Sequence, residues 1–237
     1  MSMFGLWIDP LYLVLFVVTL LISGAAQVYI KSTFSQWSGV RNSSGLAGVQ
    51  VGEKLVRDVD FGGSRGMATG ISFKIVPGDL SDHFDPRSKA IGLSQEVASR
   101  DSVAAMAVTA HEVGHAQQDA EGTVAMRARA FLVPAVTFSP TVSYVLIFVG
   151  LIFNLTGLFW LGIIVFGLMV VFSILTLPVE IGASRRALVM LRETGMLSTR
   201  EDEDGVKRVL TAAAMTYVAA AVTSILTLLY YISIARR

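Results

Sequence analysis

The chain has 237 residues, of which 53% are hydrophobic and only 16% are charged, and its mean hydropathy is +0.62. This composition is typical of a membrane protein, and a formal net charge of +1 with no basic, aromatic-rich patch gives no indication of a nucleic-acid partner. Cysteine is absent, which excludes disulfides and thiolate zinc sites, so any metal must be held by histidine and carboxylate side chains.

Four apolar segments are each long enough to cross a bilayer as a helix, at about 1.5 Å per residue. The first is preceded by no lysine or arginine and is longer than the apolar core of a signal peptide, so we expect a retained anchor. The second and third are joined by a short turn, which predicts an antiparallel hairpin. A buried hairpin of a soluble protein is the alternative, but four such segments leave too little polar sequence to cover them. The predicted spans are residues 8–30, 134–154, 158–179 and 209–234.

Two polar regions separate these spans, and with four crossings both lie on the same side of the membrane. Basic residues gather near the span ends on that side, and the positive-inside rule then places both regions in the cytoplasm. Arg236 and Arg237 at the other end of the last span argue against this orientation. The basic residues are Lys31, Arg127, Arg129, Arg185, Arg186, Lys207 and Arg208.

The first polar region contains signals for both helices and strands. A short helix over residues 45–58 is predicted, capped by a serine at position 43 or 44. Residues 71–75 alternate apolar and polar side chains, which predicts a strand. Residues 89–94 are a second strand candidate, which could receive an extended substrate at its edge. A longer helix is predicted from a cap at position 101 or 102 to residue 122.

The longer helix carries a His-Glu-x-x-His motif formed by His111, Glu112 and His115. Residues four apart project from the same face of a helix, so the two imidazoles can bind one ion. Glu112 can reach a metal-bound water and act as a general base, whereas its alternative role is that of a surface glutamate. This composition yields the motif in about one shuffled sequence per thousand, so the motif predicts a zinc hydrolase site.

Catalytic zinc usually has three protein ligands, so a third must be found. The metzincin pattern requires glycine and histidine three and six residues after the second histidine, where this chain has Gln118 and Glu121. Asp119 shares the face of both histidines but lies two turns from His111, so it suits orienting His115 better than binding the ion.

Glu180 is the strongest candidate for the third ligand. It is the only acidic residue between positions 121 and 193, and it lies at the polar end of an apolar span, where an ionisable residue indicates function. The alternative is that Glu180 forms an ion pair with Arg185 or Arg186. His83, the remaining histidine, could bind metal or contact substrate, although a lone histidine in a loop is more often polar surface.

Four stretches, residues 80–94, 109–122, 127–134 and 177–188, resemble the YugP-like family of putative neutral zinc metallopeptidases of bacterial membranes. With the order of the spans, the resemblance covers nearly the whole chain. It implies a multi-pass membrane zinc peptidase of the gluzincin type, with Glu112 as base and His111, His115 and Glu180 as ligands. Ser184 and Gly182 stand where such proteins often have aspartate, so an outer carboxylate that orients the ligands is absent at these positions.

We therefore expect a mainly α membrane protein with four transmembrane helices and a small α+β, zincin-like cytoplasmic unit. Residues 1–30 would form the anchor and residues 31–133 the catalytic unit. Residues 134–237 would form a membrane hairpin (134–180), a polar loop (181–208) and the fourth transmembrane helix (209–235). His83, Asp119, Ser184 and Arg185 are candidates for contacts with the metal ligands or with substrate.

The predicted function is that of a zinc-dependent endopeptidase in the cell (inner or plasma) membrane. It would use Zn²⁺-activated water to hydrolyse membrane or membrane-proximal proteins on the cytoplasmic side, with the bilayer and a protein or peptide substrate as partners. A site-2-type intramembrane protease is an alternative, but polar residues bracket the motif too closely and the downstream ligand motif of that class is missing. A non-catalytic zinc-binding scaffold is a second alternative, against which the intact Glu112 argues. Homo-oligomerisation is left open.

Overall fold

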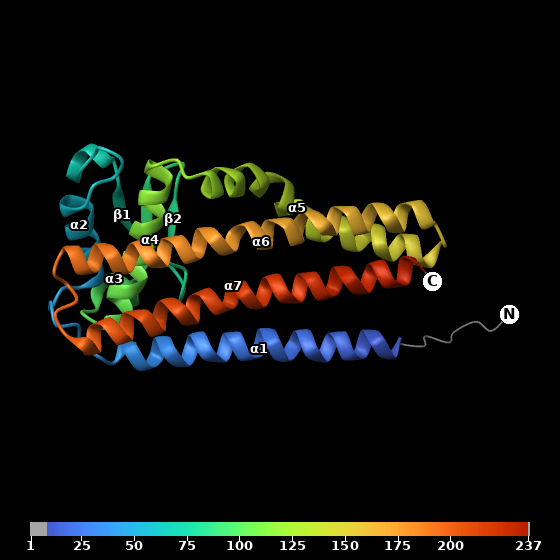
Figure 1. Cartoon of the computed structure of the whole chain (residues 1–237), viewed down its shortest axis with the longest axis horizontal. Coiled ribbons are helices and arrows are strands. Elements are labelled where there is room, and N and C mark those ends of the chain that lie inside the picture. Colours follow the sequence, from blue (N-terminus) through green and yellow to red (C-terminus); the bar gives the residue numbers. More distant parts are fainter. Residues whose placement is uncertain (1–8, 237) are drawn as a thin grey trace.

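The computed structural model describes residues 9–236, so the start of the predicted span at 8–30, and most of its flank, lies outside the described residues. Within residues 9–236, four helices are long and apolar enough to cross a membrane. They confirm the prediction of a mainly helical protein with four candidate spans, and α1, α6 and α7 run side by side along its length (Figure 1). The four are α1 (Pro10–Ser38), α5 (Val124–Ile152), α6 (Thr156–Glu193) and α7 (Arg200–Ala235).

The four helices extend well beyond the predicted spans. The stretch 181–208 was expected to be a polar loop, but it is helical except around residues 194–199. α6 ends where Gly195 adopts a left-handed φ of 69°, and α7 begins at once, with the Thr199 hydroxyl accepting a hydrogen bond from the Asp202 backbone N–H (3.1 Å). Three acidic residues within this expected loop, Glu201, Asp202 and Glu203, lie in the first turn of α7, where negative charge is favoured.

A small polar unit lies at one end of the bundle, between α1 and α5 in the chain (Figure 1). Its sheet has the order β1-β3-β2, with β3 parallel to β1 and antiparallel to β2. The two predicted strands are confirmed as β1 and β3. β3 is the central strand, however, so the prediction that it lies at an edge is wrong. The edge strands are β1 and β2, and β2 lies in a segment predicted to be a loop. The elements are α2 (Gly48–Asp58), η1 (Gly66–Thr69), β1 (Ser72–Val76), β2 (His83–Asp85), β3 (Ala90–Ser94), α3 (Gln95–Ser99) and α4 (Val103–Ala120).

The two helix starts predicted in the polar unit have different outcomes. The Ser102 hydroxyl accepts the backbone N–H of Ala105 (3.1 Å) and caps α4, which confirms that start. The start near residue 45 is wrong by three residues, because Gly45 has a left-handed φ of 65° and α2 begins only after Ala47. Neither of the two serines expected to cap α2 does so: the Ser43 hydroxyl donates to Asp202 at the start of α7, and the Ser44 hydroxyl donates to Asn42.

The core of the protein is built around α4, which is buried on nearly every side. α2, β3, α6 and α7 pack against it, and Val103, Met106 and Val113 are fully buried. The closest approach is between α4 and α6 at Gly114, where a Cβ would lie 2.5 Å from the Ala183 carbonyl oxygen. Only glycine allows this contact, and it fixes the two helices that carry the candidate metal residues.

Candidate metal centre

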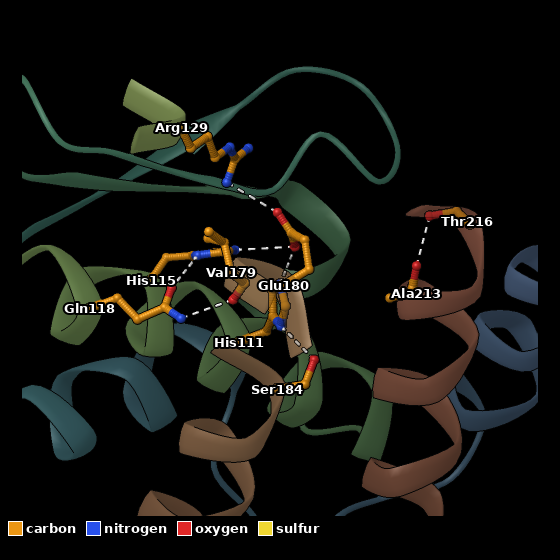
Figure 2. A network of polar contacts seen from close by, with 9 residues as sticks. All are labelled: His111, His115, Gln118, Arg129, Val179, Glu180, Ser184, Ala213 and Thr216. Carbon is orange, nitrogen blue, oxygen red and sulfur yellow. Dashed lines mark hydrogen bonds and ion pairs between the residues drawn. The ribbon is translucent and has the colours of Figure 1, made fainter. Parts of the chain in front are cut away.

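Three side chains from α4 and α6 converge on one point (Figure 2). The Nε2 atoms of His111 and His115 lie 3.2 Å and 3.3 Å from the same oxygen, Oε2 of Glu180. One ligand atom from each residue lies within 4.8 Å of the others. Two imidazole nitrogens and one carboxylate oxygen, with no thiolate, form a donor set typical of catalytic zinc.

The other nitrogen of each imidazole also has a partner. The Nδ1 atom of His111 lies 3.2 Å from the Ser184 hydroxyl, and Nδ1 of His115 lies 3.1 Å from the Gln118 side-chain oxygen. Because the Gln118 oxygen can only accept, His115 carries its proton on Nδ1, which leaves the Nε2 lone pair directed at Glu180. A partner on the remote nitrogen fixes the orientation of a metal-binding histidine, so both contacts fit a metal site.

Helix geometry explains why α6 supplies both Glu180 and Ser184. The two residues are four apart, so both face α4 across the contact at Gly114. The amide of Gln118 donates to the Val179 carbonyl (2.9 Å) and ties the end of α4 to the same turn of α6. Gly182 leaves room for this amide, since a Cβ there would lie 2.6 Å from its nitrogen.

Glu180 is almost completely buried, with 1% of its surface exposed, so its negative charge requires partners. Besides the two histidines, Arg129 of α5 donates from Nη1 to Oε1 of the carboxylate (3.1 Å). The alternative ion pairs expected from the sequence do not form: Arg186 pairs with Glu121 (2.7 Å), and Arg185 is exposed in a separate hollow beside Gln117.

Glu112 lies next to the converging residues and is 7% exposed. Burial raises the pKa of Glu112 to about 7, while the neighbouring His111 and a backbone hydrogen bond from Phe84 act in the opposite direction. A carboxyl group with such a pKa can both accept and release a proton near neutral pH.

A cavity of about 460 Å³ opens onto these residues. One wall is formed by β2 and its flanks, including His83, and the other by the first part of α5, including Arg129. Tyr217 of α7 lines the same space. The cavity therefore brings the free edge of the sheet, the candidate metal residues and the candidate base together.

The remaining predicted site residues differ in whether they line the cavity, contact a candidate ligand or pair elsewhere. His83 lines the cavity from β2, with Nδ1 2.8 Å from the Ser81 carbonyl oxygen, and Ser184 contacts His111. Asp119 forms an ion pair with Lys89, and the residue that contacts His115 is Gln118.

Sequence reasoning did not identify Gln118, Arg129 or Tyr217 as residues of the site. Gln118 had a usable signal, because a side chain three residues after His115 faces the same side of the helix. The sequence carries no comparable signal for Arg129 or Tyr217, because their positions in the site depend on how α5 and α7 pack against it.

Comparison with known proteins supports the same chemistry. A family model described as "Putative neutral zinc metallopeptidase" matches residues 12–236 of the chain. The chain is 37% identical over 224 residues to the "Putative membrane protease YugP" of Bacillus subtilis (strain 168), covering 94% of this chain and 96% of that protein. No solved structure matches the chain at a significant level.

Proposed function

Because the chain belongs to the family of putative neutral zinc metallopeptidases, we propose that it is an integral-membrane, zinc-dependent endopeptidase acting on membrane or membrane-proximal proteins. The family resemblance inferred from the sequence is confirmed by these matches. The observation that carries the proposal is the convergence of His111, His115 and Glu180 beside the buried Glu112, within one open cavity.

His111, His115 and Glu180 are proposed to hold the metal. Bound zinc supplies a Lewis acid that polarises the scissile carbonyl and makes water more acidic. Ser184 and Gln118 would hold the two imidazoles in the orientation that directs Nε2 at the metal, and the Gln118 oxygen would also keep the proton of His115 on Nδ1.

Glu112 is proposed to act as the general base and then the general acid. Its buried carboxylate would take a proton from the attacking water and later deliver that proton to the leaving amine. Burial raises the pKa of Glu112, which favours uptake of a proton by its carboxylate.

The substrate is proposed to lie along the free edge of β2. An extended peptide can pair with an unpaired strand edge through its backbone, and β2 borders the same cavity as Glu112. Tyr217 and Arg129 face the space that the scissile bond would occupy, so both are candidates to contact the substrate.

The site is proposed to lie at the cytoplasmic surface of a multi-pass protein of the cell membrane. Glu180 follows directly on the apolar segment of α6, and the zincin-like unit of residues 31–133 contains most of the remaining polar sequence. α4 is not among the helices of residues 9–236 that qualify as candidate spans, which favours this arrangement over site-2-type intramembrane proteolysis.

The test compares Glu112→Gln with the wild type in lipid vesicles, using a library of quenched-fluorescent peptides and measuring the zinc content of both proteins. We expect cleavage to fall by about 10²–10⁴-fold while zinc content is retained, because only the proton transfer is lost. Glu53→Gln, on an exposed position of α2, is the matched control. A wild type that binds zinc but cleaves no better than Glu112→Gln would instead support the non-catalytic scaffold.

A further inference from the structure

A groove lined by both apolar and polar residues runs along the bundle between α1 and α6. It has a volume of about 560 Å³, and α7, which packs against both helices, forms its floor. We call it the lateral groove. Its polar residues include Thr19, Ser23 and Gln27 of α1, Ser173 of α6, and Thr216 and Thr223 of α7.

The lateral groove lies next to a second cavity that borders the candidate active site. This second cavity of about 310 Å³ shares Gln27 and Thr216 with the groove. The same cavity shares His111, Glu112 and Tyr217 with the active-site cavity. Figure 2 shows Thr216 on α7 in the same close view as the metal residues, with its hydroxyl bonded to the Ala213 carbonyl (2.7 Å). The lateral groove and the active-site cavity are therefore neighbours on either side of this second cavity.

The length of the lateral groove suits a helix. On α1 it extends from Phe16 to Gln27, which corresponds to about 16 Å of helix axis, roughly half the hydrocarbon thickness of a bilayer. Its inner end is the end nearer the metal centre, because Gln27 belongs to both cavities. An occupant that filled the groove would therefore point one end at the active site.

The chemistry of the lining favours a peptide over a lipid chain. The hydroxyls of Thr216 and Thr223 donate to carbonyls of their own helix and keep lone pairs that can accept hydrogen bonds. The Gln27 amide has no hydrogen-bond partner among the residues that the structure describes. In hydrocarbon such an amide is costly, and an acyl chain offers it nothing, whereas a peptide backbone offers both a donor and an acceptor.

Peptide hydrolysis at this site also requires a helix to open. A membrane-spanning helix satisfies all its backbone groups internally, so residues that unwind toward the β2 edge need new partners. Gln27 lines both the lateral groove and the second cavity, which Glu112 also lines, and its amide carries one donor group and one acceptor group.

We propose that the lateral groove receives the membrane-spanning helix of a substrate protein, and that Gln27 pairs with the backbone where this helix unwinds toward the metal centre. The inference rests on the proposed peptidase function and deepens it by naming the substrate class. The substrate is a membrane protein cut at the end of a span that faces the polar unit.

The first test uses the absence of cysteine from the chain. Ser23→Cys places a single thiol in the lateral groove, and Leu21→Cys places one at nearly the same depth on a face that is 65% exposed. Both are made together with Glu112→Gln, placed in vesicles with a synthetic single-span peptide carrying one central cysteine, and oxidised. We expect the Ser23→Cys protein to cross-link at least about tenfold more than the Leu21→Cys protein, because docking raises the effective concentration.

The second test fills the lateral groove in the otherwise wild-type protein. Thr223→Trp adds bulk inside it, and Val222→Trp adds the same bulk on an exposed face of α7. The measured quantity is the cleavage rate of the spanning peptide divided by that of a soluble extended peptide. We expect this ratio to fall by about tenfold with Thr223→Trp and to stay unchanged with Val222→Trp, with zinc content confirming that both proteins are folded.

The two tests distinguish an error in the docking proposal from an error in the proposed peptidase function. Equal cross-linking at positions 21 and 23, as expected if lipid fills the lateral groove, would overturn the docking proposal even if cleavage depends on Glu112. A disulfide between two copies of the protein, in place of the peptide cross-link, would overturn it as well. Selective cross-linking without any cleavage would support docking and count against the peptidase.

Discussion

The two ends of this molecule are packed in opposite ways. Around α4, residues such as Leu55, Val103 and Met106 are completely shielded by protein. At the far end only a small cluster is buried, and apolar side chains such as Leu21 and Val14 are at least 60% exposed. The polar end therefore buries its own core, whereas the outer end relies on lipid to cover its apolar surface.

α6 belongs to both regions, and Glu180 lies where one changes into the other. Toward the outer end of the molecule, α6 borders the lateral groove at Ser173. Toward the polar end, it packs tightly on α4 at Ala183. The contrast suits a site with two requirements. Under the proposed function, the tightly packed end would hold the metal residues in place, and the loosely packed end would leave room for access from the bilayer.

Removing the carboxylate of Glu180 should cause the greatest loss of zinc binding. Glu180→Gln should weaken zinc binding by more than about 100-fold. Removing a residue that only contacts a metal ligand typically weakens binding by about 10–100-fold, and the loss of a ligand should exceed this. Glu193→Gln, on an exposed position of the same helix, should leave affinity unchanged. Competition with a chelator of known affinity measures both, and equal affinities in the two variants would show that α6 supplies no ligand.

A smaller effect should distinguish the packing of the two regions directly. Gly114→Ala places a methyl group against the Ala183 backbone and should lower the free energy of unfolding by about 1–3 kcal/mol. Gly167→Ala, in the outer part of α6, meets nothing within 4 Å and should be neutral or stabilise by about 0.5–1 kcal/mol through helix propensity.

Unfolding of both glycine variants can be followed in one detergent, together with their zinc content. If Gly167→Ala were as damaging as Gly114→Ala, the contrast in packing would not hold.

Most of the helical architecture could be predicted from the sequence, because hydropathy marks the segments that prefer lipid. Hydropathy does not mark where a helix ends, so α6 and α7 continue through residues 181–193 and 200–208, which were expected to be a loop. Their ends depend on local features such as Gly195 and Thr199, which become clear only once the two helices are known to continue.

The candidate site could be predicted where its signal is local, and not where it depends on packing. His111, Glu112 and His115 share one motif, and Glu180 stands out as a lone charge after an apolar run. Arg129 reaches the site only through the fold of α5 over the cavity. Strand order has the same limitation: period-two alternation locates a strand, but it does not tell whether that strand is central or at an edge.

The smallest effect concerns which residues orient the two histidines. Ser184→Ala should weaken zinc binding by about tenfold, because His111 loses the partner of its Nδ1 atom. Asp119→Asn should change affinity by less than about threefold, since its carboxylate pairs with the half-exposed Lys89, and such surface pairs contribute little. The same chelator competition measures both variants. The reverse order, with Asp119→Asn the more damaging, would mean that the polar end rearranges when it binds zinc and that its tight packing does not fix the ligands in advance.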